Sequence, residues 1–369
     1  MEIGPRFLPP LALLVLGRSP AEALARVHAL FALCRHGQCL ALSKAVAQAL
    51  DVPATPEWAR LLRALRDLEM LREHSLNLLR LPGWPAPEPS LPPRLLKALA
   101  GLAAALSGGG STVFVPDGTS ITLDRASLTR HSQELGAALE GLLGSDWLDG
   151  PHDFDGTLRN GRSPYARFLA ALGPDADVGR DVTSGHLPAR LPEPELSAIF
   201  RDPTAASFAA SPVWHAQPRE TGCYSRFHRR THLAAARELY GHGVASRIFA
   251  RLAEMRVLAQ GLRRRLDFLM NRSVVEKPAP RRSDGFGLGQ VQTARGLLIH
   301  AVSLRDGTIA DCRYVAPTEW NFHPQGLVPA ALTGLPADDE QSLFRRVGLF
   351  LQAIDPCVEF QLHLSHSHP

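Results

Sequence analysis

The fold of this chain is decided by the stretch Arg295-Gly296-Leu297-Leu298-Ile299-His300 and by Val315-Ala316-Pro317-Thr318-Glu319-Trp320-Asn321, which follows it. Two apolar runs, 296–303 and 308–315, lie on either side of Asp306-Gly307 within this region. An Asp-Gly pair between such runs is typical of a β-hairpin, because glycine adopts the positive φ that a tight turn requires. The stretch therefore predicts two antiparallel strands joined at Asp306-Gly307.

The composition is that of an ordinary globular protein. The chain has 369 residues, of which 45% are hydrophobic and 21% charged, and its formal net charge is +4. These values allow a sizeable core in one large domain or two. A charge of +4 is small for this length, so no nucleic-acid partner is expected. Five cysteines are too few for a disulfide framework, which favours a reducing compartment and a cytoplasmic location.

The apolar segment from Phe7 to Leu16 follows Arg6, as in a short secretory signal. It contains Pro9 and Pro10, is too short to cross a bilayer and has no cleavage signal close behind it. A buried strand is therefore the favoured interpretation. No other window approaches the length of a transmembrane helix, so no membrane span is expected.

Helix signals dominate the rest of the chain. Ser19 followed by Pro20 is typical of a helix start, because serine caps free N–H groups and proline is tolerated in the first turn. A second hairpin is predicted around Asp117-Gly118, between 112–115 and 121–123. Helices are predicted over 20–36, 40–50, 56–81, 92–106, 126–143, 164–172, 226–270 (as one or two helices) and 338–354.

Residues 145–217 are rich in Gly, Pro, Asp and Ser, and are predicted to form a loop-rich insertion with one short helix. The sequence contains no internal repeat and no low-complexity tract. The pattern predicts an α+β fold that is mainly helical with small β-hairpins. We expect residues 1–369 to form a single domain with the two termini brought together.

The C-terminal sequence Asp355-Pro356-Cys357-Val358-Glu359-Phe360-Gln361-Leu362-His363 carries a candidate metal motif. It reads like Asp-Pro-Cys-x-x-Cys-x-x-His with Phe360 in place of the second cysteine. A thiolate suits a soft or borderline metal, and the loss of one ligand changes what the set can hold. The motif therefore indicates a metal pocket of which only part is kept.

Four separated segments resemble, in the right order, those of the large subunit of nickel–iron hydrogenases. The stretch from Leu33-Cys34 through Lys44-Ala45-Val46 resembles the N-terminal Cys-x-x-Cys-x-x-x-His helix, and Glu220-Thr221-Gly222-Cys223-Tyr224-Ser225-Arg226 resembles the central Glu-x-Gly-x-x-Ala-Arg stretch. The region 295–321 is similar to the Ala-Pro-Arg-Gly…His hairpin and the Pro-Thr-x-Trp-Asn segment, and 355–363 closes the set. The resemblance implies the helical core of that family.

Departures from the family imply that hydrogen turnover is absent. In the enzymes four cysteine thiolates hold nickel, and two of them bridge to an iron that carries cyanide and carbon monoxide. The resemblance places Cys34 and Cys357 at two of the four positions, whereas Phe31 and Phe360 stand at the other two. Gln38 replaces the usual histidine. Phenylalanine offers no lone pair, so a four-thiolate nickel site cannot form and no nickel is expected.

The resemblance matches Arg295 and Thr318 to the residues that hydrogen-bond the two cyanides on the iron, the arginine through its planar donor fork. Such groups without nickel ligands suit a protein that handles the Fe(CN)2CO fragment transiently, before nickel arrives. The resemblance therefore implies a hydrogenase expression/formation protein of the HupK/HoxV type, a scaffold without enzyme activity. Its partners would be a hydrogenase large subunit and other maturation proteins. Cys34 and Cys357 would hold the iron, with His363 orienting the metal site.

Two other functions stay open: an active or sensory hydrogenase large subunit with a shifted ligand set, and a metal-free protein that docks other assembly factors. Arg295 could also form an ion pair with Asp355. His228 and His232 have an i, i+4 spacing that could bind a metal, although arginines lie close to them. Structural roles are expected for Cys39, Cys223, Cys312 and Glu220, although Cys39 could chelate a metal together with Cys34.

Overall fold

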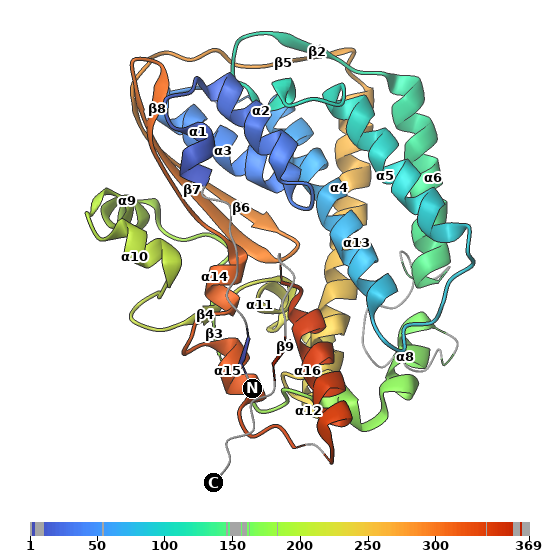
Figure 1. The fold of residues 1–369 in the computed structure, drawn as a ribbon. Coiled ribbons are helices and arrows are strands. Elements are labelled where there is room, and N and C mark those ends of the chain that lie inside the picture. Colours follow the sequence, from blue (N-terminus) through green and yellow to red (C-terminus); the bar gives the residue numbers. More distant parts are fainter. Residues whose placement is uncertain are drawn as a thin grey trace.

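The computed structural model describes residues 2–3, 11–53, 55–144, 147, 156, 161, 163–182, 184–336, 338–356 and 362–363. Long helices form a bundle on one side of the molecule, and a sheet with its covering helices lies on the other (Figure 1). The predicted α+β class, mainly helical, is confirmed.

Four long amphipathic helices form the bundle. α4 (Pro56–Arg80) packs along α13 (Val244–Met270), and α5 (Leu91–Ser107) packs along α6 (Arg125–Leu143) (Figure 1). α5 ends at Gly108, whose φ of 64° is a left-handed conformation that costs glycine little. The apolar faces of these helices enclose the larger of two apolar clusters.

The sheet consists of β6 (Gly285–Thr293), β7 (Gly296–Arg305) and β8 (Thr308–Val315), antiparallel in that order. α3 (Arg35–Ala49) lies across β6 and β7. The approach is so close that a Cβ added to Gly289 would lie 1.8 Å from the carbonyl oxygen of Ala41. Glycine in β6 therefore allows α3 to pack directly on the strand.

The other described helices are α1 (Leu11–Val15), α2 (Pro20–Leu30), α8 (Pro164–Leu172), α9 (Glu193–Arg201), α10 (Ala205–Ala210), α11 (Cys223–Phe227), α12 (Ala234–Tyr240), α14 (Pro317–Asn321), α15 (Leu327–Leu332) and α16 (Glu340–Ile354). Short 3₁₀ turns cover Thr112–Phe114, Gly173–Asp177 and Thr231–Leu233. Three two-stranded pairs complete the fold: β1 (Glu2–Ile3) with β9 (Leu362–His363), β2 (Ser120–Thr122) with β5 (Val274–Glu276), and β3 (Gly185–His186) with β4 (Arg219–Glu220).

Both faces of β7 are buried. Leu298 and Val302 belong to the larger apolar cluster, whereas Leu297 and Ile299 join a second cluster with residues of α9, α10 and α14. Successive side chains of a strand point to opposite faces, so one strand can serve two cores. The sheet is therefore held rigidly between the α3 side and the α9–α10 side.

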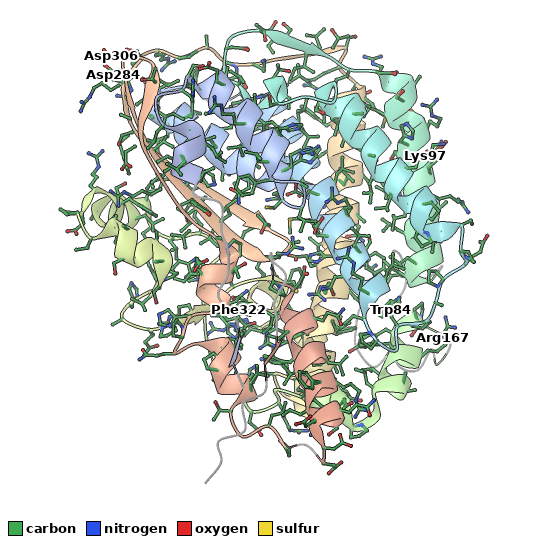
Figure 2. The ribbon with its side chains drawn as sticks, in the orientation of Figure 1. Trp84, Lys97, Arg167, Asp284, Asp306 and Phe322 are labelled. Atoms are coloured by element: carbon green, nitrogen blue, oxygen red, sulfur yellow. The ribbon has the colours of Figure 1, made fainter. Side chains whose placement is uncertain are left out.

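The hairpin at Asp306-Gly307 is confirmed. Asp306 and Gly307 have φ values of 51° and 71°, as the tight turn requires. The Asp306 N–H donates to Asp284 Oδ1 at 2.6 Å, and the two residues lie together at the tip of the sheet (Figure 2). Sequence reasoning missed β6, because glycine at alternate positions weakens the strand signal.

Two strand predictions are wrong. Residues 11–15 of the supposed N-terminal strand form α1, in which Leu11 and Val15 are buried while Leu13 is 74% exposed. Burial at i and i+4 is a helical pattern that a short apolar run does not reveal. The hairpin at Asp117-Gly118 does not form either, since β2 pairs with β5 instead. Pro116 stands directly before that turn and cannot donate a ladder hydrogen bond.

Helix boundaries differ in two places. The helix predicted over 20–36 ends at Leu30, and α3 begins at Arg35. The segment 226–270 forms two helices, α12 and α13, as the prediction allowed, but α12 begins only at Ala234. The loop-rich region 145–217 also contains α9 and α10, which were not predicted. Among the described residues, none of the helices is both long enough and apolar enough to traverse a bilayer.

Candidate functional site

Arg295 lies in the turn between β6 and β7, and its side chain is buried. Its Nη2 donates to Glu73 Oε2 at 2.9 Å and lies 3.6 Å from Asp355 Oδ1. Glu73 comes from α4 and Asp355 directly follows α16, so the arginine joins the sheet to the bundle and to the C-terminal motif. A buried guanidinium is costly unless it is paired, and these carboxylates compensate its charge.

The backbone around Arg295 is fixed by the central segment. Leu297 N–H donates to Thr221 Oγ1 at 2.9 Å, and Thr221 N–H donates to Asn321 Oδ1 at 2.8 Å. Asn321 Nδ2 donates to the Arg295 carbonyl at 3.5 Å. Gly296 has a φ of 134°, and a Cβ there would lie 2.3 Å from Thr221 Cγ2. Hydrogen bonds thus connect the central segment, the hairpin and the Pro-Thr-x-Trp-Asn segment at this turn.

Thr318 lies at the start of α14, directly after β8, and is 2% exposed. β8 runs antiparallel to β7, with Val315 opposite Ile299. The end of β8 and the beginning of β7 therefore lie at the same end of the sheet. Arg295 and Thr318 therefore belong to segments at the same end of the sheet.

Cys34 directly precedes α3 and is half-buried. Gln38 donates from Nε2 to Cys34 Sγ at 3.8 Å, and its Oε1 lies 2.7 Å from His300 Nε2. Burial lowers the pKa of His300 to about 3, so the imidazole is neutral at pH 7 and its Nε2–H is the donor to Gln38. Gln38 therefore connects the Cys34 thiol to β7.

Glu69 of α4 caps the N-terminal end of α3. Its carboxylate accepts the N–H of His36 at 2.6 Å and that of Gly37 at 2.9 Å. Burial raises the pKa of Glu69 to about 7; the two N–H groups lower it, and the charge of Glu73 raises it. Burial and nearby positive charges lower the pKa of His36 to about 4. The first turn of α3 therefore lies beside a carboxyl group whose pKa is raised to about 7.

A second arginine, the half-buried Arg226, connects α11 to α13. Arg226 Nε and Nη2 donate to the two carboxylate oxygens of Glu254, each at 2.6 Å, and Nη2 also donates to the Thr293 carbonyl at 3.1 Å. His74 Nε2 lies 2.9 Å from Glu254 Oε2. Burial would raise the pKa of Glu254, but Arg226 and His74 lower it to about 2. Glu254 is therefore an anion that holds α4, α11 and α13 together.

The last turn of α16 is anchored on the bundle. Arg251 of α13 donates to Asn77 Oδ1 and, at 2.9 Å, to the Ala353 carbonyl. Asn77 Nδ2 donates to the Gln352 carbonyl at 3.0 Å. Asp355, the next residue after α16, is thereby positioned near Arg295.

Part of the predicted metal site lies outside the described residues. Cys357 and Phe360 belong to that part of the chain, so the approach of Cys357 to Cys34 stays a prediction. The backbone of His363 pairs with β1. Phe31 directly follows α2, is half-buried and packs against the larger apolar cluster. Within the described ranges, no group of three or more His, Cys, Asp or Glu side chains is arranged to hold a metal ion.

Other candidate residues have structural surroundings. His228 stacks on His186 with ring centroids 3.6 Å apart, whereas His232 packs against an aromatic ring of α11. Glu220 is buried and forms an ion pair with Arg247, as expected for a fold contact. Among the cysteines that the structure describes, Cys39, Cys223 and Cys312 are buried.

The predicted Arg295–Asp355 ion pair forms, at 3.6 Å, but three buried acidic residues around the site were not predicted. Glu69, Glu73 and Glu254 lie on predicted helices, where acidic residues usually face solvent. A signal was present on α4, because Glu69 and Glu73 continue at i, i+4 spacing from Leu65, which is buried. Acidic residues aligned with an apolar face indicate buried hydrogen-bond acceptors, such as Glu69 for backbone N–H groups and Glu73 for Arg295.

Comparison with known proteins identifies the family. A family model described as nickel-dependent hydrogenase matches residues 193–363. Hydrogenase expression/formation protein HupV of Azotobacter chroococcum mcd 1 is 31% identical over 98% of this chain and 93% of its own length. HupK of Rhizobium leguminosarum bv. viciae is 30% identical over 94% of this chain and 88% of its own length. The chain belongs to the hydrogenase expression/formation proteins of the nickel–iron hydrogenase family.

The fold of this expression/formation protein is that of a hydrogenase large subunit. The Ni-Fe-Se hydrogenase from D. vulgaris Hildenborough superposes with a TM-score of 0.68 over 95% of this chain and 92% of its own, at 16% identity. At this identity the likeness establishes the fold alone, and it confirms the predicted hydrogenase-like helical core. The HupV and HupK relatives are, by name, accessory proteins of hydrogenase formation.

Proposed function

We propose that this expression/formation protein is an assembly scaffold that holds the Fe(CN)2CO fragment, or transfers it, for a nickel–iron hydrogenase large subunit. The observation that carries the proposal is the buried Arg295 guanidinium at the end of the sheet, between Glu73 and Asp355. The fragment is cargo, and the protein binds it without turning over hydrogen. Other maturation proteins would deliver and receive it.

Recognition of the fragment would depend on Arg295. A guanidinium donates charge-assisted hydrogen bonds to anionic acceptors, and an iron-bound cyanide is an acceptor of this kind. The 3.6 Å separation from Asp355 exceeds a direct hydrogen bond, whereas the 2.9 Å contact with Glu73 is one. A guest could therefore displace Asp355 at a lower cost than Glu73. The Thr318 hydroxyl would act as the second donor from the same end of the sheet.

The thiolates would come from Cys34 and Cys357. A thiol loses its proton when it binds a metal, and the Gln38 amide that donates to Cys34 Sγ would stabilise the resulting anion. Phe31 and Phe360 offer no ligand at the other two positions. Two thiolates can hold an iron fragment but cannot form a four-thiolate nickel site, so we infer that hydrogen turnover is absent.

Infrared spectroscopy tests this proposal. Protein purified after co-production with hydrogenase maturation proteins should show cyanide and carbonyl stretching bands together with bound iron. Cys34→Ala should abolish the bands, because it removes a thiolate. Cys312→Ala, which alters a buried cysteine of β8, is the control and should keep them. Wild-type protein that contains no iron and shows no cyanide or carbonyl bands under these conditions would exclude the scaffold function.

One observation favours a second candidate function, a metal-free protein that docks assembly factors. Arg295 already has carboxylate partners, which is what a purely structural arginine needs. This function predicts no infrared bands and predicts that Cys34→Ala still supports hydrogenase maturation. The third possibility, an active hydrogenase, predicts hydrogen oxidation by the protein with its partner subunit, and the phenylalanines at 31 and 360 weigh against it.

A further inference from the structure

A pocket of about 480 Å³ lies at the end of α3 that is farther from Cys34. Its walls come from the second half of α3, from β6 and from the segment that leads into α9. The charged side chains that line it are Lys44, Asp51, Arg190, Glu193 and Arg282. Lys44 is ten residues beyond Cys34, or about 15 Å along the helix axis. The pocket is therefore separate from the proposed fragment site.

Hydrogen bonds hold the walls of this pocket in place. Gln290 of β6 accepts the Leu191 N–H at 2.8 Å and donates to the Leu191 carbonyl at 2.9 Å. Gln48 of α3 accepts the Leu288 N–H at 2.6 Å and donates to Glu193 Oε2 at 3.3 Å. The segment before α9 is thus joined to the strand and to the helix. A pocket that exists before binding avoids much of the ordering cost of ligand capture.

Positive charge dominates the lining. Arg190 forms an ion pair with Glu193, which neutralises that carboxylate within the pocket. Lys44 Nζ donates to the Gln290 carbonyl at 3.1 Å. Desolvation lowers the pKa of Lys44 to about 8, helped by the positive charges of nearby arginines that include Arg66 and Arg190. The neighbouring cations disfavour the ammonium form of Lys44, because they create a positive potential at this position. A positive potential attracts anions.

Arg282 is the available donor of the pocket. Its side chain is exposed, and within the described residues no hydrogen bond or ion pair engages its guanidinium. Its backbone N–H donates to the Leu50 carbonyl at 3.3 Å, which fixes the arginine at the end of α3. Asp51 is the carboxylate of the lining that Arg190 does not neutralise. Lys44 and Arg282 therefore leave an excess of positive charge.

We propose that this pocket binds a small organic anion through a carboxylate or phosphate group held by Lys44 and Arg282. Carboxylates and phosphates both accept hydrogen bonds from the ammonium of a lysine and from the planar guanidinium of an arginine. Ala47, Val52 and Leu288 provide an apolar wall for the body of the ligand. The volume is within the range of small-molecule sites, and too small for a folded partner.

Arg281 provides a matched control. It is adjacent to Arg282, is also exposed, and its N–H donates to the same Leu50 carbonyl at 3.1 Å, but it does not line the pocket. Arg281→Gln and Arg282→Gln remove the same charge from neighbouring positions of one segment. A difference between them in anion binding can therefore be assigned to the pocket and not to the general charge of the surface.

Calorimetric titration of the full chain with inorganic phosphate, succinate and adenosine monophosphate at low ionic strength tests the proposal and separates phosphate from carboxylate ligands. At least one probe should bind, and Arg282→Gln should weaken its binding by about tenfold or more, because the substitution removes a charge-assisted hydrogen-bond donor. Arg281→Gln should leave the affinity within about twofold of wild type. Absence of binding by all three probes, or equal losses in the two variants, would overturn the proposal. Neither result bears on the fragment site, which infrared spectroscopy tests independently.

Discussion

The ionic contacts of Arg295 join three parts of the chain that are distant in the sequence. Its turn belongs to the sheet, Glu73 to α4 and Asp355 to the C-terminal motif. A buried arginine with two carboxylate neighbours is stable without a guest, yet only the Glu73 contact has the length of a direct hydrogen bond. The residue can therefore support the fold and still receive an anionic ligand on the side of Asp355.

Replacement of Arg295 by lysine separates these two roles. Arg295→Lys keeps a charge for Glu73 but loses the planar fork, so the cyanide and carbonyl bands per protein should fall by about tenfold or more. The midpoint of thermal unfolding should change little. Arg313→Lys, on β8 and paired with Asp311, is the control and should leave the bands unchanged. Bands of wild-type intensity in Arg295→Lys would show that the fork does not hold the fragment.

Gln38 is expected to stabilise the fold as well as the thiol. Gln38→Leu removes the acceptor of the buried His300 N–H, and an unsatisfied buried donor costs roughly 1–3 kcal/mol. Urea unfolding should show a loss of this size. Gln352→Leu removes an exposed side-chain bond to the Arg80 carbonyl and should cost less than about 0.5 kcal/mol. Equal losses would mean that the Gln38–His300 contact contributes nothing specific.

At the scale of elements, the site depends on how closely α3 packs on the sheet. Cys34 directly precedes α3, and Gln38 lies in its first turn. His300 lies on β7, and Arg295 lies in the turn before that strand. Glycines of β6 let the helix backbone lie against the strand, so the thiol of one element reaches the imidazole of the other through a single glutamine. A shift of α3 would therefore break the connection.

Gly289→Ala tests that packing. A Cβ at Gly289 would lie 1.8 Å from the Ala41 carbonyl oxygen, so α3 must move away from the strand. The free energy of unfolding should fall by roughly 1–3 kcal/mol or more. Gly348→Ala places a methyl on α16 where nothing lies within 4 Å, and should increase stability by roughly 0.5–1 kcal/mol. A neutral effect of Gly289→Ala in urea unfolding would contradict the close packing.

Glu254 predicts how stability depends on pH. Its pKa in the folded protein is about 2, below the ordinary value of 4.5, so its stabilisation is fully present above pH 4.5 and is lost as the pH falls toward 2. This difference between the two pKa values corresponds to roughly 3 kcal/mol in the free energy of unfolding. Urea unfolding should therefore show that wild type and Glu254→Gln differ in their free energy of unfolding at pH 7. This difference should become smaller as the pH is lowered to 3. Glu140→Gln, which changes an exposed side chain of α6, should have the same free energy of unfolding as wild type across this pH range. A difference between wild type and Glu254→Gln that is independent of pH would refute the assignment.

At the scale of the molecule, local signals predicted local structure. Ser19 with Pro20 fixed the start of α2, and Asp306-Gly307 fixed the hairpin, because caps and turns depend on adjacent residues. The pairing of β2 with β5 and the contact of Glu73 with Arg295, 222 residues apart, depend on packing that no short window contains. The resemblance to hydrogenases supplied the candidate site residues, and the sequence also indicated Asp355 as a partner of Arg295, but Glu73 was not predicted.

The proposed function requires that this protein carry the Fe(CN)2CO fragment for a hydrogenase large subunit. The most direct measurement is infrared spectroscopy of the protein loaded with ¹³C-labelled cyanide, before and after it is mixed with a large subunit produced without the fragment. The proposed function predicts isotope-shifted bands on this protein that then appear, at altered frequencies, on the separated large subunit. Labelled bands that are never found on this protein, while the large subunit acquires them from the other maturation proteins alone, would contradict it.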